Sequence, residues 1–362
     1  MSVGPADDGH SDTEAAADGA APAGGLRLTD WRIWLGLAIT VVSVWWAGRG
    51  IPVSEVVTAM RRADFWSLLI FSAPFYTASV YVRALRWRHL TNPIAPMSRQ
   101  VLFRSESLGF MVNNVLPLRI GEVVRSWTLS QDTGTSFSAV FGSVVLERVL
   151  DVVAVLVLAG GALAYAGRSS DVGGILAEGS ILLLPVGAAP LAVLILMRMA
   201  PEFVIRVSHV VLLPLPLHLR ERIEGLLRSF MEGLGALSGG AHLFWVVLHS
   251  ITIWLLLSAA PIWIGFWAFG VDLGSPVDTL FSSWILLGAV GVAVAIPSAP
   301  GFIGPYQLAF KAVLVRLGVD PATALAMGVL VWFVFWLTLT LQGLFFLRSS
   351  RRSLTELAGH SH

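Results

Sequence analysis

A short stretch at residues 113–125 combines two arginines, a glutamate, two asparagines, a proline and a glycine within an otherwise apolar sequence. Arg119 and Arg125 could hold a phosphate through charge-assisted, bidentate hydrogen bonds, and Glu122 could balance them or meet a cation. Because ionisable residues at bilayer depth are costly, they usually mark a functional site. In a helix, their spacing of three would put all three side chains on one face. The alternative is a cytoplasmic loop whose charges are merely solvated.

The same stretch is broken by residues that interrupt a helix. Pro117 removes a backbone donor, and Gly121 permits a close approach or an unusual dihedral angle. A half-helix that starts near Pro117 would point free N–H groups and its dipole at an anion. We therefore predict that Pro117, Asn113 and Asn114 contribute to a binding site together with the charged residues.

A second cluster, Glu147, Arg148 and Asp151, lies inside the apolar run 137–165. Arg148 and Asp151 are three residues apart and the two acids are four apart, so a neutralising network is predicted on one helix face. One acid is left over unless Arg119 or Arg125 reaches it. The cluster either contacts substrate or forms a structural ion pair that locks two helices, since buried pairs often specify packing.

A third cluster follows the apolar run 279–297, where three prolines and two glycines leave backbone groups free. The residues predicted to bind or to shape a cavity there are Ser298, Pro300, Gly301, Gly304, Gln307 and Lys311. Residues 117–121 and 300–304 share the pattern Pro-x-x-Ile-Gly. Paired interruptions of this kind indicate a site between two structural repeats. The alternative is a tight turn between two membrane spans.

The composition is that of a protein dissolved in a bilayer. Of 362 residues, 56% are hydrophobic and 13% are charged, and the mean hydropathy is +0.76. Soluble domains carry about 25% charged residues. The absence of cysteine excludes disulfides and Cys-ligated metals. No catalytic or phosphate-loop motif is found, so we expect no enzyme activity, no cofactor, no metal and no nucleic-acid partner.

The apolar runs predict an all-α, polytopic fold with about eight transmembrane helices and two interrupted or re-entrant segments. The predicted spans are 32–48, 66–86, 137–165, 181–199, 243–270, 279–297 and 323–347, with 302–318 counted as a short crossing and 103–125 as re-entrant. The distribution of arginines then predicts that both termini lie in the cytoplasm of a multi-pass cell-membrane protein. The loop 49–64 is the exception, because it would lie outside yet carries Arg49, Arg61 and Arg62. Residues 1–30 are predicted to be a disordered acidic tail, 31–347 the membrane domain, and 348–362 a short basic tail.

Residues 218–237 are typical of an amphipathic helix on the membrane surface, although a plain connecting helix fits equally well. The tryptophans Trp31, Trp34, Trp45, Trp46 and Trp66 are predicted to be interfacial anchors.

The order of these motifs resembles the lysylphosphatidylglycerol synthase transmembrane, or flippase-like, domain family. The similarity begins at Arg83 and Arg86-Trp87, continues through the three clusters at 113–125, 147–151 and 297–307, and ends at Leu317-Gly318. It implies an all-helical membrane fold that moves or presents lipids, including aminoacylated phospholipids and polyprenyl-linked lipids. Many members carry Glu where this chain has Gln307. Only residues 348–362 follow the last span, too few for an aminoacyltransferase, so lysine transfer is not expected.

We therefore predict a lipid flippase or transporter that binds a phospholipid or polyprenyl-linked headgroup, with membrane lipids as its partners. Two alternatives stay open: a membrane-embedded transferase acting on a lipid headgroup, and a non-transporting subunit of a lipid-modifying complex. Association with a second copy or with a lipid-modifying enzyme is compatible with each.

Overall fold

The computed structural model describes residues 31–166, 196–197, 199–236, 240–295 and 298–349. Within these ranges the chain forms helices and no strand, which confirms the predicted all-α class. The predicted tail 1–30, most of the predicted span 181–199 and most of the tail 348–362 lie outside the described residues.

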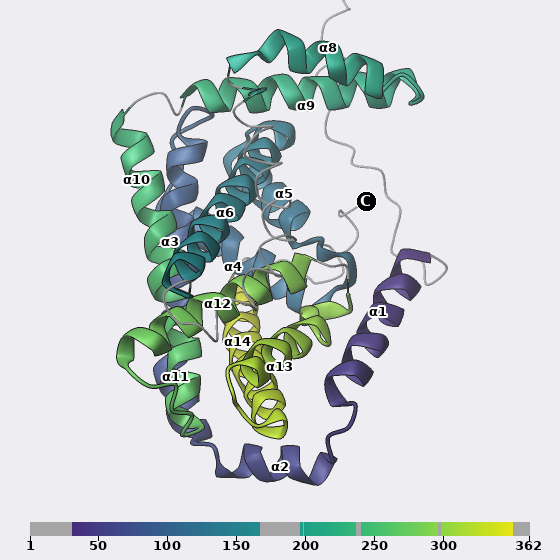
Figure 1. Ribbon diagram of the computed structural model, residues 1–362. Helices are drawn as coiled ribbons and strands as arrows, with labels where there is room; N and C mark the ends of the chain where they lie inside the picture. The colour runs from purple at the N-terminus through teal and green to yellow at the C-terminus, as the bar shows by residue number, and fades with distance from the viewer. Residues whose placement is uncertain (1–30, 167–195, 198, 237–239, 296–297, 350–362) are drawn as a thin grey trace, which may run out of the picture.

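Helices form a bundle whose two ends are each crossed by further helices (Figure 1). The bundle contains α1 (Trp31–Gly48), α3 (Phe65–Thr91), α6 (Phe137–Ala166), α10 (Gly240–Ile251), the π-helical η2 (Thr252–Leu257), α11 (Ala260–Ala268), α12 (Pro276–Ala295) and α14 (Pro321–Ser349). The amphipathic α2 (Val53–Arg62) lies across one end, and α8 (Pro201–Val211) and α9 (Leu217–Ala236) lie across the other. Helix α9 confirms the helix predicted at 218–237, and it packs on α6.

Four described helical segments are long and apolar enough to cross a membrane: Phe65–Thr91, Phe244–Ala268, Pro276–Val294 and Pro321–Ser349. A fifth is added if the pair Trp34–Gly48 and Val53–Arg62, bent by 81°, is one broken span. The predicted count of about eight is therefore not confirmed. Helix α13 (Pro305–Arg316) has 12 residues. At 1.5 Å per residue it is about 18 Å long, shorter than a hydrocarbon core of about 30 Å, so the crossing predicted at 302–318 is not confirmed.

The interrupted segment predicted at 103–125 is a helical hairpin with a broken tip. It consists of α4 (Arg99–Val115), the 3₁₀ turn η1 (Pro117–Arg119) and α5 (Gly121–Thr133). Arg104, near the start of α4, forms an ion pair with Asp132, near the end of α5. The hairpin therefore enters and leaves at the same end of the bundle, as a re-entrant segment does. A second 3₁₀ turn, η3 (Pro300–Phe302), stands between α12 and α13.

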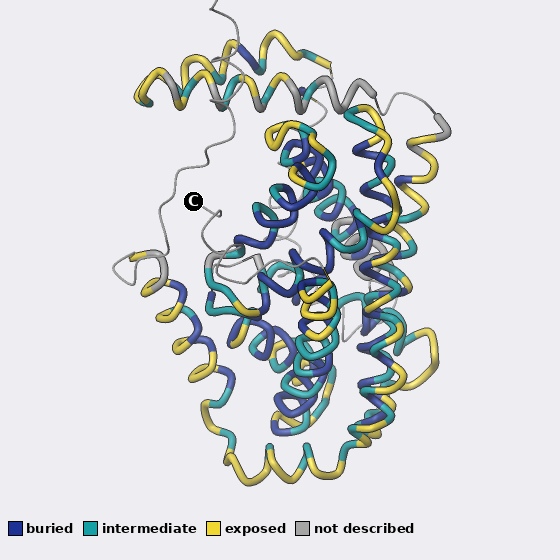
Figure 2. Tube along the Cα trace, turned by 180° about the vertical axis from the view of Figure 1, so that it is seen from behind, coloured by how far each residue is buried: buried dark blue, intermediate teal, exposed yellow. Residues whose placement is uncertain are grey.

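Helix α1 buries one stripe of small residues against the rest of the protein and exposes its remaining surface (Figure 2). The buried stripe is Gly36, Thr40, Ser43 and Ala47. The five predicted anchor tryptophans are 59–68% exposed. Small residues facing protein and large apolar residues facing outward are typical of a helix that borders lipid.

The start of α3 is tied to the end of α11 and sets the depth of the helix that carries two buried arginines. Asp64 N–H donates to the carbonyl of Ala268 at 2.9 Å. The Asp64 carboxylate caps α3 by accepting hydrogen bonds from the hydroxyl and backbone N–H of Ser67, which hold the pKa of Asp64 below its usual value.

We predict that Gly343→Ala destabilises the packing of α14 on α4. A Cβ atom there would overlap Cβ of Met111 and would lie 2.8 Å from the carbonyl oxygen of Ser107. Overpacking of this kind costs about 1–3 kcal/mol. The measurement is the thermal unfolding midpoint in detergent, with Gly288→Ala as the matched control because its Cβ would meet no atom within 4 Å. Equal midpoints for the two variants would contradict the packing described here.

Candidate functional site

Eight charged side chains form a continuous network of ion pairs between α3, α4, α5 and α6. The network contains four arginines and four carboxylates: Arg83, Arg86, Arg125, Arg148, Glu106, Glu122, Glu147 and Asp151. Its formal charge is zero. Because a charge in hydrocarbon must be paired, the network explains how these side chains are accommodated inside an apolar bundle.

The centre of the network is Glu147, whose side chain is fully buried. One of its oxygens lies 2.8 Å from Nη2 of Arg86, and the other lies 2.8 Å from Nη2 of Arg125. Arg125 also pairs with Glu106 and stacks over the ring of Trp87, 4.8 Å from its centroid. The neutralising network predicted on α6 is therefore present, and Arg125 is the residue that reaches the additional acid.

Asp151 joins the network to the π-helical turn of the neighbouring helix. It pairs with Arg83 at 3.1 Å, Arg86 at 2.8 Å and Arg148 at 3.3 Å, and accepts a hydrogen bond from the indole N–H of Trp254 at 3.0 Å. The Arg83 guanidinium lies 5.3 Å from the Trp254 ring centroid. Trp254 belongs to η2, and single π-helical turns occur frequently at functional sites.

The two Pro-x-x-Ile-Gly segments meet inside the bundle. Both form 3₁₀ turns, and η1 contacts η3. Their third residues, Arg119 and Phe302, have φ angles of 54° and 64°, a conformation that non-glycine residues rarely adopt. The Arg119 guanidinium lies over the Phe302 ring, 5.1 Å from its centroid. The predicted convergence of the two interrupted segments is therefore confirmed.

Helix α14 forms hydrogen bonds to both interrupted segments, the hairpin tip at η1 and the turn η3, through two tryptophans one helical turn apart. Trp332 Nε1 donates to the carbonyl of Gly301 at 2.6 Å, and Trp336 Nε1 donates to the carbonyl of Asn114 at 3.1 Å. The Asn114 side chain donates in return to Thr340 at 3.2 Å. These bonds satisfy carbonyls that the interrupted helices leave free, which non-helical backbone at membrane depth requires.

A cavity of about 170 Å³ lies between the network and the two breaks. Its charged lining residues are Arg83, Arg119, Glu122 and Arg148, and aromatic rings including Phe302 and Tyr306 line the rest. Pockets for whole drug-sized molecules are roughly 300–1,000 Å³, so this one matches a small polar group.

Arg119 differs from the other arginines on this wall. Within the described residues it forms no ion pair with a carboxylate, and its Nε has no hydrogen-bond partner. Arg148, with a side chain that is 38% exposed, is held by Glu122 at 3.6 Å and by Asp151. The cavity wall therefore presents one cation that stands outside the ion pairs, with the charge of Glu122 acting on it from beyond ion-pair distance.

The structure brings four predicted residues to the cavity wall: Asn113, Arg119, Glu122 and Arg148. The predicted common helical face of Arg119, Glu122 and Arg125 does not form. Helix α5 begins only at Gly121, whose N–H donates to Oδ1 of Asn113 at 2.8 Å, and Arg119 precedes it in the left-handed region.

The other predicted residues of the first two clusters stand behind the wall or face α14. Arg125, Glu147 and Asp151 are buried in the network, and Asn114 bonds to α14. Pro117 is the first residue of η1 and shapes the turn.

The third predicted cluster serves mainly local structure. Gln307 Oε1 accepts from the N–H of Gly304 at 2.8 Å, and Lys311 Nζ contacts the carbonyls of Trp46 at 3.4 Å and Arg49 at 3.3 Å, at the end of α1. Gly304 has a φ of 95° and packs closely on Thr40 of α1, where a Cβ would lie 2.8 Å from a carbonyl oxygen.

The remaining members of this cluster lie in η3 or directly before it. Gly301 has a φ of 71° and Pro300 begins the turn. The hydroxyl of Ser298 is buried without a hydrogen-bond partner in the described part of the chain. None of these residues is on the cavity wall, whereas Phe302 and Tyr306 of the same segment are.

The family profile described as the lysylphosphatidylglycerol synthase TM region matches residues 33–343. The chain belongs to this family. Glycosyltransferase AglD of Haloferax volcanii is 27% identical over 336 residues, which cover 82% of this chain and 50% of AglD. The UPF0104 membrane protein PH1989 of Pyrococcus horikoshii is 25% identical over 343 residues, which cover 88% of this chain and 96% of that protein. No solved structure matches the chain.

This comparison corrects the prediction that the protein is not an enzyme. A relative named as a glycosyltransferase matches 82% of this chain, and the chain spans about half the length of that relative. The absence of familiar catalytic motifs from an intramembrane sequence therefore does not exclude chemistry in this lysylphosphatidylglycerol synthase TM family member.

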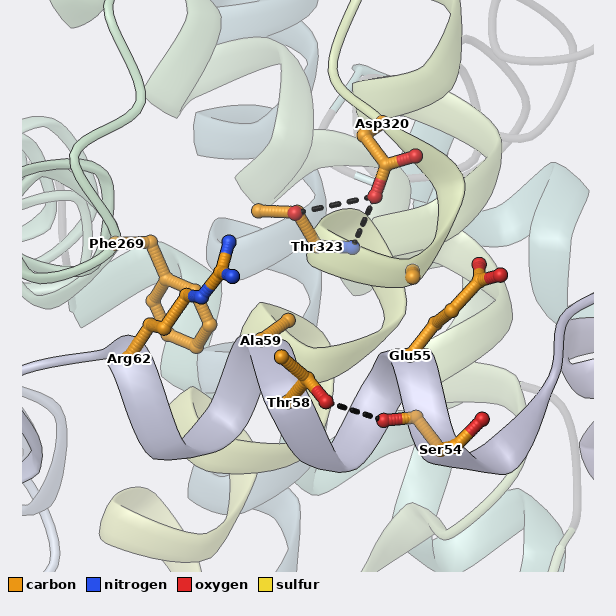
Figure 3. Close-up of a pocket in the computed structure, with 9 residues that line it drawn as sticks. Ser54, Glu55, Thr58, Ala59, Arg62, Phe269, Asp320 and Thr323 are labelled. Atoms are coloured by element: carbon orange, nitrogen blue, oxygen red, sulfur yellow. Dashed lines mark hydrogen bonds between the residues drawn. The ribbon is translucent and has the colours of Figure 1, made fainter.

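A second hollow, of about 400 Å³, lies at the surface between α2 and the start of α14 (Figure 3). Polar side chains line it, including Glu55, Arg62 and Asp320. Asp320 caps α14 by accepting hydrogen bonds from the N–H and hydroxyl of Thr323. None of the predicted site residues lies there.

We predict that Arg86→Gln strongly destabilises the protein, because it leaves Glu147 and Asp151 short of a buried partner. Breaking a buried pair from one side costs about 3–5 kcal/mol. Arg61→Gln, on the exposed face of α2, is the control and should unfold at the parental temperature. A parental thermal midpoint for Arg86→Gln in detergent would show that the network does not stabilise the fold.

Proposed function

We propose that the protein binds the anionic headgroup of a membrane lipid in the central cavity and moves that lipid between leaflets. The observation that carries the proposal is Arg119, a cation on the cavity wall without a carboxylate partner among the described residues. The other charged residues of the site form a formally neutral network, so a phosphate beside Arg119 would balance the one positive charge that remains. Membership of the lysylphosphatidylglycerol synthase TM family supports a role in lipid handling.

In this proposal Arg119 is the phosphate ligand and Arg148 assists it from α6. Charge-assisted bonds from guanidinium groups suit phosphate oxygens well. Glu122 and Asn113 position Arg148, since Asn113 Nδ2 lies 3.3 Å from Glu122 and Glu122 lies 3.6 Å from Arg148. Arg125, predicted from the sequence as a phosphate ligand, lies instead behind the cavity wall, where it pairs with Glu106 and Glu147.

The size of the cavity supports headgroup binding without tail binding. Its volume of about 170 Å³ leaves no room for acyl or polyprenyl chains. These chains would remain in the surrounding bilayer while the polar group crosses, so only the headgroup needs shelter from hydrocarbon.

We place the protein in the cell membrane with the end that carries α8 and α9 in the cytoplasm. That end carries Arg206, Arg220 and Arg228, and the turn after α11 at the opposite end carries Asp272 and Asp278. Helix α2, also at the opposite end, carries Arg61 and Arg62 together with Glu55. A second copy or a lipid-modifying enzyme is the partner class that fits this setting.

A second candidate function is transfer of a group to a lipid headgroup held in the same cavity. The relative named as a glycosyltransferase favours it. Incubating the purified protein with an activated sugar and a lipid phosphate would decide: a covalently modified lipid supports transfer, and unmodified lipid together with exchange between leaflets supports transport alone.

We predict that Arg119→Ala slows the movement of a labelled phospholipid in proteoliposomes by about 10-fold or more, because a charge-assisted hydrogen bond contributes about 1.5–3 kcal/mol. The measurement is the loss of fluorescence when a quencher reaches only the outer leaflet. Arg316→Ala, an exposed arginine at the end of α13, should retain the parental rate. Parental movement by Arg119→Ala protein would refute the assignment.

A further inference from the structure

Building on the proposed function, we infer that the cavity selects a headgroup with a single negative charge, a phosphodiester, over a doubly charged phosphate monoester. Glu122 is the residue that determines this specificity. The inference is carried by the charge balance of the site and by the position of Glu122 on the cavity wall.

The charge balance follows from the ion pairs. The network of four arginines and four carboxylates is formally neutral and is closed by contacts of 2.8–3.6 Å and by the Arg125–Glu106 pair. Arg119 remains, so the described site carries one positive charge in excess. Its neighbours Tyr76 and Tyr306 on the same wall are neutral phenols and do not change this sum.

A singly charged phosphodiester beside Arg119 leaves the site neutral. A doubly charged monoester leaves one negative charge uncompensated in a largely apolar cavity. Burying an unpaired charge costs free energy, so we expect the monoester to bind more weakly than the diester, although the monoester carries the larger negative charge.

Glu122 prevents the site from offering a second cation. It is the one carboxylate on the described cavity wall, and its side chain is 18% exposed. Its oxygens face Nε of Arg148 at 3.6 Å and Nδ2 of Asn113 at 3.3 Å. Removing the charge of Glu122 without changing its size would leave Arg148 with Asp151 as its remaining acidic partner and would add one positive charge at the cavity.

The test compares two water-dispersible lipids that differ in the headgroup: dioctanoyl phosphatidylglycerol, a diester, and dioctanoyl phosphatidic acid, a monoester. The comparison is made at alkaline pH, where a phosphate monoester carries its second negative charge and a phosphodiester carries one. Dissociation constants are measured by native mass spectrometry of the full chain in detergent. The parent should bind the diester about 10-fold more tightly, equal to about 1.4 kcal/mol.

Variants of Glu122 test whether this residue causes the preference for the diester. Glu122→Gln should shift the ratio of the two constants by about 10-fold or more toward the monoester. Glu122→Asp, which keeps the charge, should retain the parental preference, as should Glu202→Gln on the exposed surface of α8. An unchanged ratio in a Glu122→Gln protein that still binds lipid would overturn the role of Glu122.

Failure of the inference and failure of the proposed function differ in this experiment. If the parent binds both lipids equally, or binds the monoester more tightly, the charge selection is wrong and headgroup binding stands. If the parent binds neither lipid, both proposals are overturned.

Discussion

The rest of this structure depends on the requirement that charge inside hydrocarbon be paired. Four arginines and four carboxylates meet that requirement in one network that joins α3, α4, α5 and α6. Since Glu147 binds arginines from two other helices at once, it fixes their depth and rotation relative to α6. The network is thus both a structural lock and the wall of a cavity. The site lies at the place where the lock leaves one cation, Arg119, unmatched.

A second constraint is that every broken helix must satisfy its free backbone groups. At the hairpin tip, Asn113 accepts a hydrogen bond from the start of α5. Side chains from other helices satisfy the remaining groups: Trp332 and Trp336 donate to carbonyls, and Thr40 accepts from Ala299 N–H at 2.8 Å. These hydrogen bonds hold Arg119 and Phe302, both in the left-handed backbone conformation, in contact inside the bundle. The backbone irregularity is therefore held in place from several helices, as expected where strain is retained at a functional site.

The features that could be predicted from the sequence are those that depend on residue spacing and on rare residue types in an apolar chain. The ion pairs on α6 and the meeting of the two Pro-x-x-Ile-Gly segments follow from local patterns, and both were confirmed. Contacts between distant helices could not be predicted in this way. The predicted second span ends at residue 86, at a run of charged residues, whereas α3 continues to Thr91, and the spacing along this segment does not predict that Arg83 and Arg86 pair with acids of α6. The hydrogen bond from Trp254 to Asp151 could not be predicted, because a π-helical turn within an apolar run has no distinguishing residue pattern. Gln307 was interpreted as a ligand because residue type does not reveal that the nearest partner is a backbone amide.

The most direct test of the central claim is an electron cryo-microscopy map of the protein in a lipid nanodisc that contains phosphatidylglycerol. The account predicts that η1 and η3 remain in contact and that headgroup density lies within hydrogen-bond distance of the Arg119 guanidinium. A map in which Arg119 pairs with a carboxylate of the protein, or in which lipid headgroups bind only at the outer surface of the bundle, would contradict it.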